Sequence, residues 1–558
     1  MKRLYDKINN QDNFLLAIEA IKNNKGSKTP GLDGKTIKHV IANLDKWWWV
    51  IRTSLENYKP QLVKRVEIPK ANGKTRPLGI PTIRDRIIQQ MFKQILETFI
   101  DPKFHPNSFG FRPNRSAEHA LTLQNTLINR GKLYYCIDVD IKGFFDNIDH
   151  EKLTKQLWKL GIKDKKVLSI IKRMLKAKIK LPNGYIIIPE KGTPQGGILS
   201  PLLANIYLNE FDWWIHRQWD GIKLKHKYSS QSVKVRALKN TNLREVKIVR
   251  YADDFKLMCR NFQDAKITMK LATQFLKEKL FLECSPEKTK LINLRRKASE
   301  FLGFRIKAIR KRTNKTNWVV KTNMLPKSKK KVKANLKLNL KNIKKCNDFS
   351  RIKLIMKYNS QVLGIQNYYK IATHINIDLA KIGFELKKCM FNLFGQGSYK
   401  PDERWKRIYK GYSYRTWTIR GITLFTIQAC RHRYPMQFSP KNKVKVKTSK
   451  ELITEESEIL FSRIEYSINP NWEKTRAEIY FLQKGICAIT GEYIKHNQFD
   501  VHHILPKSKG GTDELSNLIL IKKEIHKEIH KKNPNAELMK NRKFIEYRNK
   551  LNASDLEN

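Results

Sequence analysis

The stretch that decides the fold runs Val246-Lys247-Ile248-Val249-Arg250-Tyr251-Ala252-Asp253-Asp254-Phe255-Lys256-Leu257-Met258. Two runs rich in β-branched and apolar residues flank the tetrad Tyr251-Ala252-Asp253-Asp254, so the pattern predicts two strands joined by a tight hairpin turn. Plain hairpin turns favour Asn-Gly or Asp-Gly. Two adjacent carboxylates repel each other, and a divalent metal removes that repulsion by taking both as ligands. The alternative is a solvated acidic turn, which is the commoner outcome for two aspartates alone.

A second acidic strand precedes this hairpin. The run Tyr134-Tyr135-Cys136-Ile137-Asp138-Val139-Asp140-Ile141 is predicted to be a strand, and its alternation places Asp138 and Asp140 on one face. A carboxylate at this strand's end, beside Asp253 and Asp254, can assemble a two-metal site for in-line phosphoryl transfer. Carboxylates suit that chemistry because the hard Mg²⁺ ion prefers oxygen ligands.

A basic hairpin and two loops supply candidate phosphate ligands. Residues 64–81 carry cations on both arms and turn at Asn72-Gly73. Arg and Lys on a rigid hairpin suit a triphosphate, and a charged solvent face is the equal alternative. Arg112 and Arg115 are expected to be available for phosphate. The three glycines in residues 192–201 are expected to let backbone approach a nucleotide or template.

Hydrophobic spacing predicts the main helices. They are expected at 15–21, 37–55, 84–96, 202–209 and 327–345. The three consecutive tryptophans at 47–49 favour packing over base stacking. Residues 221–247 lack periodicity and are expected to form a surface insertion. The lysine-rich 327–345 helix suits an RNA groove or a membrane surface equally well.

Composition points to a polyanionic partner. The chain has 558 residues, 112 Lys and Arg against 51 Asp and Glu, and a formal net charge of +61. Such a charge favours nucleic acid as the partner, and 40% hydrophobic residues are enough for real cores. Seven scattered cysteines without a CxxC pair favour a reducing compartment. No apolar run approaches bilayer length, and no signal core opens the chain, so we expect no membrane partner and action where the protein is made.

Histidines gather near the C-terminus. Five of the chain's 13 histidines fall between His496 and His530. His526 and His530 are spaced i, i+4, which places both imidazoles on one helix face, within reach of one metal.

Several motifs in one order resemble the group II intron-encoded reverse transcriptases, or maturases. They are Arg76-Pro77-Leu78, Ser108-Phe109-Gly110-Phe111-Arg112-Pro113, Asp140-Ile141-Lys142-Gly143-Phe144-Phe145-Asp146, Thr193-Pro194-Gln195-Gly196-Gly197, Tyr251-Ala252-Asp253-Asp254, Ser285-Pro286-Glu287-Lys288-Thr289-Lys290 and Phe301-Leu302-Gly303-Phe304. Their shared order is far more specific than any one motif. The helix containing residues 358–369 is similar to the family's thumb, domain X, which grips primer–template and intron RNA.

The resemblance implies roles residue by residue. Asp140, Asp253 and Asp254 would hold two Mg²⁺ ions, while Asp138 matches no catalytic acid and is expected to be structural. Lys70 and Arg76 would bind the incoming deoxynucleoside triphosphate, and Lys64 is a weaker candidate for the same role. Phe145 would exclude ribonucleotides by contact at the sugar 2′ position, and Gln195 would lie near the nascent base pair.

The C-terminal motifs resemble an HNH nuclease (ββα-metal) module, with which members of this family often end. His502, His526 and His530 would coordinate one divalent metal, Mg²⁺ or Mn²⁺. His503 would be the general base that activates water, and Asn517 would orient its loop. The family pattern usually has two CxxC pairs for a structural zinc. Here only Cys487 remains, with Thr490, Lys522 and Ile525 at the other positions, which argues against zinc.

The resemblance implies a multidomain α/β and α fold with right-hand polymerase architecture. The expected domains are fingers and palm (1–310), an α-helical thumb or domain X (311–425), a basic DNA-binding linker (426–478) and the HNH module (479–540). The implied function combines RNA-directed DNA polymerase, intron-splicing maturase and site-specific DNA endonuclease in intron mobility. The implied partners are group II intron RNA, target DNA, an RNA template with a DNA primer, and dNTPs. The expected compartment is the bacterial cytoplasm or an organelle.

Two other classes of protein remain as alternatives. One is an RNA-binding splicing maturase with weak or vestigial polymerase or endonuclease activity. The intact set of three acids argues against it, because a pure binder gains nothing from clustered anions near RNA phosphates. The other is a stand-alone homing nuclease, which the long polymerase-like portion disfavours.

Overall fold

The chain divides into two compact units, residues 1–442 and 443–558. The computed structural model describes residues 4–22, 24–69, 73, 75–222, 224, 226–311, 313, 316–346, 348–399, 415–419 and 422–438 of the first unit, and residues 472, 475–476, 479–480, 483, 485–492, 494, 498–531 and 534–552 of the second. Within these residues, no helix has both the length and the apolar composition needed to cross a membrane.

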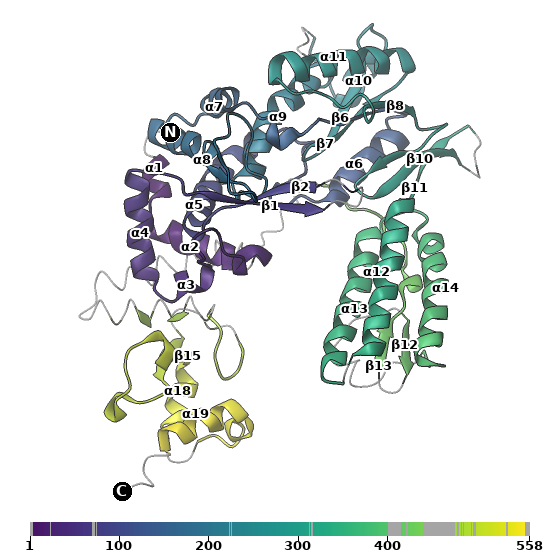
Figure 1. The fold of residues 1–558 in the computed structure, drawn as a ribbon. Coiled ribbons are helices and arrows are strands. Elements are labelled where there is room, and N and C mark those ends of the chain that lie inside the picture. The colour runs from purple at the N-terminus through teal and green to yellow at the C-terminus, as the bar shows by residue number, and fades with distance from the viewer. Residues whose placement is uncertain are drawn as a thin grey trace. The chain divides into compact units, whose positions relative to one another are not determined.

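The first unit is built from helices around several small β-sheets, of which the one that contains β1 and β4 is mixed and the others are antiparallel (Figure 1). Its helices are α1 (Leu4–Ile8), α2 (Gln11–Lys22), α3 (Ile37–Ile41), α4 (Leu44–Glu56), α5 (Ile83–Ile100), α6 (Ala117–Asn129), α7 (His150–Lys159), α8 (Lys165–Leu175), α9 (Ser200–Arg217), α10 (Gln231–Lys239), α11 (Phe262–Leu280), α12 (Pro326–Lys345), α13 (Asp348–Tyr369) and α14 (Ile375–Phe394). Its strands are β1 (Val63–Pro69), β2 (Thr75–Ile80), β3 (Tyr135–Val139), β4 (Ile179–Lys180), β5 (Ile186–Ile187), β6 (Val246–Tyr251), β7 (Asp254–Cys259), β8 (Lys290–Asn293), β9 (Ser299–Phe301), β10 (Phe304–Arg310), β11 (Trp318–Met324), β12 (Thr416–Ile419) and β13 (Ile422–Phe425).

The central sheet brings the two acidic segments together. Its strand order is β6-β7-β3-β8, and every neighbouring pair is antiparallel. Val139 at the end of β3 pairs with Phe255 near the start of β7. Asp140, the next residue after β3, therefore lies beside Asp254, the first residue of β7. A buried apolar core lies against this sheet and includes Ile137 and Leu257.

A second sheet, in the order β2-β1-β4-β5, carries the basic hairpin. Further along the chain, β9, β10 and β11 form a three-stranded sheet, and the predicted domain boundary after residue 310 falls between the paired strands β10 and β11. Helices α12, α13 and α14 then lie side by side, with the β12–β13 hairpin against α13 (Figure 1). Fully buried Asn359 fastens that hairpin, because its amide donates to Thr423 O (3.0 Å) and accepts from Phe425 N (2.8 Å).

The second unit contains a small ββα arrangement. Strands β14 (Phe499–His503) and β15 (Leu518–Lys522) pair antiparallel, and α18 (Lys523–Ile529) follows directly. Helix α19 (Arg542–Asn552) comes last among the elements that the structure describes. Apolar residues of both strands and of α18 share a buried core with Phe544 of α19.

The structure confirms most of the local predictions and corrects two. The 246–258 hairpin and the helices near 15–21, 84–96, 202–209 and 327–345 are present. The helix expected at 37–55 is two helices, because the Asn43 side chain accepts from Lys46 N and starts α4 anew. The 221–247 stretch contains α10. Of the three tryptophans, Trp47 is buried but Trp49 is 67% exposed, so packing holds only for part of that run.

Candidate functional site

A two-residue turn carries the aspartate pair. Tyr251 pairs with Asp254, so Ala252 and Asp253 alone connect β6 to β7. Ala252 has φ +59, a left-handed conformation that non-glycine residues seldom adopt. Such a turn persists only where the surroundings hold it.

A buried arginine holds this turn from inside the protein. Arg250 is fully buried, and its guanidinium pairs with Asp212 at 2.6 Å. The same guanidinium donates to Ala252 O and to Asn205 Oδ1, both at 2.9 Å. Gly110 lies against the turn so closely that a Cβ there would come within 2.2 Å of Ala252 N, which explains why this position is glycine. The contacts from Arg250 and Gly110 thus hold the turn through its backbone.

Removing the buried guanidinium should destabilise the first unit strongly. We expect Arg250→Met to lower the free energy of unfolding by about 3–5 kcal/mol, because Asp212 is left charged and buried without its partner. Denaturant unfolding measures the loss. The exposed Arg217→Met serves as the matched control, and Arg250→Met with Asp212→Leu should recover part of the loss. Equal stability of Arg250→Met and Arg217→Met would contradict the role of Arg250 in holding the turn.

The acidic residues line one cleft of about 430 Å³. Asp140, Asp253 and Asp254 all border it, and Asp253 is exposed. Lys288 donates to Asp140 Oδ2 at 3.1 Å. The carboxylate oxygens of the three aspartates do not lie as close together as the ligands of one metal ion. Among the described residues, only the histidine cluster described below has three potential metal ligands within 4.8 Å of one another.

A buried lysine sits behind Asp254. Lys256 is 4% exposed, and its Nζ lies 3.1 Å from Asp138 Oδ1 and 3.8 Å from Asp254 Oδ1. The Ser299 hydroxyl also donates to Asp138, at 2.9 Å. These contacts give Asp138 a structural partner. Burial raises the pKa of Asp254 to about 6; nearby carboxylates add to the rise and Lys256 opposes it.

The raised pKa of Asp254 predicts pH-dependent metal binding. Below about pH 6 a metal must displace the carboxyl proton, so Mg²⁺ affinity should fall by about tenfold per pH unit. Titration of a His526→Ala variant between pH 5 and 7 measures this without the histidine cluster. In the metal-free protein, Asp254 keeps a proton in the folded state that it loses in the unfolded state, so its contribution to the free energy of unfolding, measured against an Asp254→Asn variant, should decrease as pH rises from 3.8 to above about 6. A pH-independent Mg²⁺ affinity would contradict both expectations.

The basic hairpin is joined to the glycine loop. Arg76 Nε donates to Gln195 Oε1 at 3.0 Å, and Gln195 Nε2 donates to Asp146 Oδ2 at 3.2 Å. Gly196 has φ +109, and a Cβ there would meet Gly79 O at 2.5 Å, so these glycines serve close backbone packing. Lys64 is exposed on β1, and Lys70 lies outside the described residues.

Phe145 lies in the short 3₁₀ turn after β3. Its ring packs edge-on against Phe144 with centroids 5.3 Å apart. Its carbonyl accepts from Thr193 N at 2.7 Å, so the glycine loop holds the Phe145 backbone. The Phe145 side chain is partly exposed.

The expectation that Arg112 and Arg115 are available for phosphate is wrong for Arg112. Its guanidinium is buried and pairs with Asp101 at 2.7 Å. It also donates to the carbonyls of His105 and Ser108, which uses its donors internally. Arg115 stacks on Phe438, 4.0 Å from the ring centroid, and burial lowers its pKa to about 10. A Gly/Pro loop pattern does not reveal that the arginine folds back onto residues 4 to 11 positions earlier.

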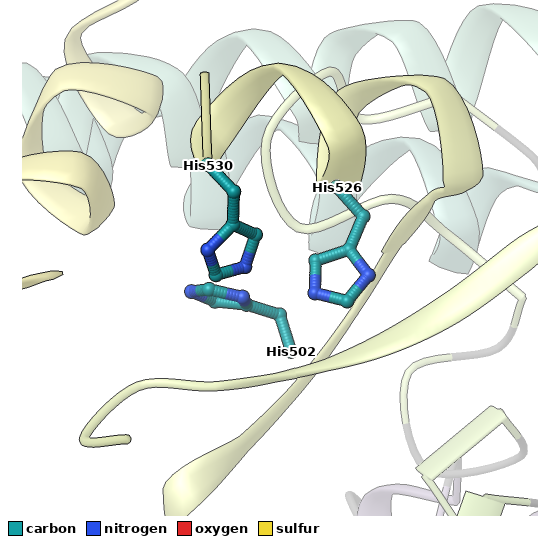
Figure 2. A group of neighbouring side chains, drawn as sticks. All are labelled: His502, His526 and His530. Carbon is teal, nitrogen blue, oxygen red and sulfur yellow. The ribbon is translucent and has the colours of Figure 1, made fainter. Parts of the chain in front are cut away.

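A compact histidine cluster lies in the second unit (Figure 2). His502 on β14 faces His526 of α18 and His530 just beyond it, and one ring nitrogen from each lies within 4.8 Å of the others. Buried His502 Nε2 has no hydrogen-bond partner among the described residues. Burial, with the neighbouring imidazoles, lowers the pKa of His502 to about 4. Neutral imidazoles with an unpaired buried nitrogen are suited to a divalent metal.

A carboxylate orients one ring of the cluster. Asp500 Oδ2 lies 2.7 Å from His526 Nδ1, which leaves Nε2 to face the cluster. Burial alone would raise the pKa of Asp500, but His526, the Val501 backbone N–H and Arg476 together lower it below its usual value. Asp500 was missed in the sequence, although it lies two residues before His502 on the same strand.

His503 points away from the cluster and has its own partners. Its Nε2 lies 2.8 Å from Asp513 Oδ1, and Trp472 stacks on its ring with centroids 5.4 Å apart. Asn517 bridges the intervening loop, because its Oδ1 accepts from Leu505 N (2.8 Å) and its Nδ2 donates to Leu505 O and Thr512 O (both 2.9 Å).

The positions expected for a zinc knuckle hold other chemistry. Cys487 is buried in the apolar core of the second unit, as is Ile525. Lys522 forms an ion pair with Glu492. One thiol among these side chains does not make a tetrahedral sulfur site.

Comparisons with known proteins match one family model to the first unit and another to the second. The model of the family "Reverse transcriptase (RNA-dependent DNA polymerase)" matches residues 68–306, and that of "HNH endonuclease" matches residues 485–532. Protein YkfC of Escherichia coli strain K12 is 34% identical over 302 residues, 52% of this chain and 78% of YkfC. Group II intron-encoded protein LtrA of Lactococcus lactis is 33% identical over 445 residues, 67% of this chain and 71% of LtrA.

The chain belongs to the group II intron-encoded proteins. Its reverse transcriptase and HNH domains confirm the predicted enzyme class, an RNA-directed DNA polymerase joined to an endonuclease. Another relative, the putative COX1/OXI3 intron 1 protein of Saccharomyces cerevisiae, is 29% identical over 53% of this chain and 38% of its own length. Both enzyme families depend on divalent metals, and the cleft and the histidine cluster of this intron-encoded protein offer suitable ligands.

Proposed function

We propose that the acidic cleft, lined by the paired ends of β3 and β7 and by residues 300–303 and 325–328, is the polymerase centre of this intron-encoded protein. The observation that carries this proposal is the strand register, which places Asp140 beside Asp254 and beside the turn that contains Asp253. Asp140, Asp253 and Asp254 would bind two Mg²⁺ ions, with Lys288 leaving Asp140 on binding. Bound Mg²⁺ would neutralise charge on the attacking and leaving oxygens of phosphoryl transfer.

The residues around the cleft would position the nucleotide. Arg76, with Lys70 and more weakly Lys64, would bind the triphosphate through charge-assisted hydrogen bonds. Gln195, held between Arg76 and Asp146, would lie against the nascent base pair. The Phe145 ring, whose backbone is held by the glycine loop, would exclude a 2′-hydroxyl.

Shortening Phe145 should weaken sugar discrimination. We expect Phe145→Ala to lower the preference for deoxynucleotides over ribonucleotides in kcat/KM by about 10²-fold, because space opens at the 2′ position. Primer extension with each nucleotide class measures the ratio. Phe145→Tyr keeps the ring and should keep the preference. A ratio unchanged in Phe145→Ala would remove the gating role.

The parts of the chain fit a right-hand polymerase followed by a nuclease. Residues 1–310 would form the fingers and palm, and residues 311–425 the thumb. The support is the α12–α14 group, whose first helix carries many lysines. Residues 426–478 would contact DNA, and residues 479–540 would form the nuclease module. Most of residues 426–478, including Lys443 and Lys445, lie outside the described residues.

In the nuclease module, His502, His526 and His530 would hold one Mg²⁺ or Mn²⁺. The metal would stabilise the leaving oxygen of the DNA strand. His503 would accept a proton from water at Nδ1, because Asp513 occupies Nε2. Asn517 would keep the loop between His503 and Asp513 in place through its three hydrogen bonds.

Together these activities would support splicing and mobility of a group II intron by target-primed reverse transcription. The protein would bind its intron RNA, nick target DNA and extend the new 3′ end with dNTPs on the RNA template. The test supplies intron RNA, target DNA and dNTPs to the full chain. The expected product is cDNA joined to the nicked strand; splicing without any extension would favour the vestigial-polymerase alternative.

A further inference from the structure

A second cleft lies between α7 and α8, away from the carboxylates. Its volume is about 660 Å³, within the roughly 300–1,000 Å³ of ligand pockets. Buried Leu168 and Gln156 are among its lining residues, and none of the lining residues is shared with the acidic cleft. Five lysines and one tryptophan also line it: Lys152, Lys155, Lys159, Lys165, Lys172 and Trp158.

Three of the five lysines of this α7–α8 cleft form no ion pair within the described residues. Lys152 pairs with Glu210 at 2.9 Å, and Lys155 pairs with Glu151 at 4.0 Å. The other three lysines, all exposed, have no ion pair within the described part of the chain: Lys159, Lys165 and Lys172. Three unpaired cations around one opening attract an anion that carries several charges.

Trp158 adds an aromatic surface to the cleft. Its side chain is 41% exposed, although tryptophan on an amphipathic helix usually packs inward, and Lys163 Nζ lies 4.1 Å from its ring centroid. Aromatic rings beside flexible cations are typical of single-stranded nucleic acid binding, in which bases stack and phosphates meet lysines. A compact metabolite would need convergent short donors, whereas this cleft offers long side chains around its opening.

We propose that the α7–α8 cleft binds a single-stranded segment of RNA outside the polymerase centre. One base would stack on Trp158, and neighbouring phosphates would contact Lys159, Lys165 and Lys172. The choice of RNA rests on the proposed function, because RNA is the template and the intron ligand there.

The test uses the full chain with its polymerase cleft saturated by an RNA–DNA primer–template. A fluorescent oligouridylate is then titrated as the second ligand. Trp158→Ala should weaken its binding by roughly 5- to 100-fold, the loss of one stacked base, while Trp158→Phe keeps most of the affinity. Trp49→Ala removes another exposed tryptophan, from α4, and should leave the affinity unchanged.

Salt dependence tests the lysines separately. Replacing Lys159, Lys165 and Lys172 with glutamine should lower the slope of log K against log [salt] by about 2, since each phosphate contact on a single strand contributes about 0.7. The matched control replaces the exposed α11 residues Lys266, Lys270 and Lys277 with glutamine and should lower it less. The proposal would be overturned if the two lysine sets changed the salt slope equally. It would also be overturned if Trp158→Ala and Trp49→Ala changed the oligouridylate affinity equally. Primer extension in the same samples measures polymerase activity independently. A missing polymerase activity can therefore be told apart from missing RNA binding at the α7–α8 cleft.

Discussion

Replacing Asp253 and Asp254 together with asparagine should reduce primer extension by roughly 10³-fold or more, in line with losses when charge stabilisation of a transition state is removed. Asparagine keeps the size of each side chain but cannot supply the negative oxygens that Mg²⁺ prefers. The turn itself should survive, because Arg250 contacts the Ala252 carbonyl and not the aspartates. Extension of a DNA primer on an RNA template with Mg²⁺ measures the effect.

The control for this double variant removes the same charge elsewhere. Glu278→Gln with Glu287→Gln changes two exposed acids and should keep extension. RNA affinity should rise by a similar small amount in both double variants, because each removes two negative charges. DNA nicking should also persist in the aspartate variant. Extension at the wild-type rate would eliminate the metal-binding assignment.

His503→Ala should abolish DNA nicking while cDNA synthesis continues. General-base catalysis contributes about 10²–10⁴-fold, and the loss should approach that range because Asp513 and Trp472 hold His503 in one orientation. Asp513→Asn should cause a smaller loss, since it removes the orienting charge and keeps the imidazole. Nicking of a supercoiled plasmid that carries the target site measures each rate.

A metal-binding measurement separates the base from the ligands. His526→Ala should abolish both nicking and Mn²⁺ binding at the cluster, whereas His503→Ala should abolish nicking alone. Calorimetric titration with Mn²⁺ distinguishes the two. His226→Ala changes an exposed histidine of the first unit and should affect neither. Loss of Mn²⁺ binding in His503→Ala would make His503 a ligand and not a base.

Local patterns predicted the chemistry-bearing segments well. The alternating runs around Asp253-Asp254 form the expected hairpin, and the i, i+4 spacing of His526 and His530 places both in one cluster. These predictions succeed because hairpin and helix geometry depend on neighbouring residues. Arg112 was misjudged because its partner Asp101 lies across a loop and leaves no periodic signal.

The sequence by itself determined the order of the motifs, the turn between two strands, the paired histidines and the excess of positive charge. Only the tertiary structure decided that Asp140 lies beside Asp254, that buried Arg250 clamps the turn through Asp212, and that His502 joins its two partners. It also decided that Lys159 and Lys172, on different helices, share one cleft with Trp158. The reason is physical: strand register and side-chain packing join residues far apart in the chain, and hydrophobic periodicity reports only which face of an element is buried.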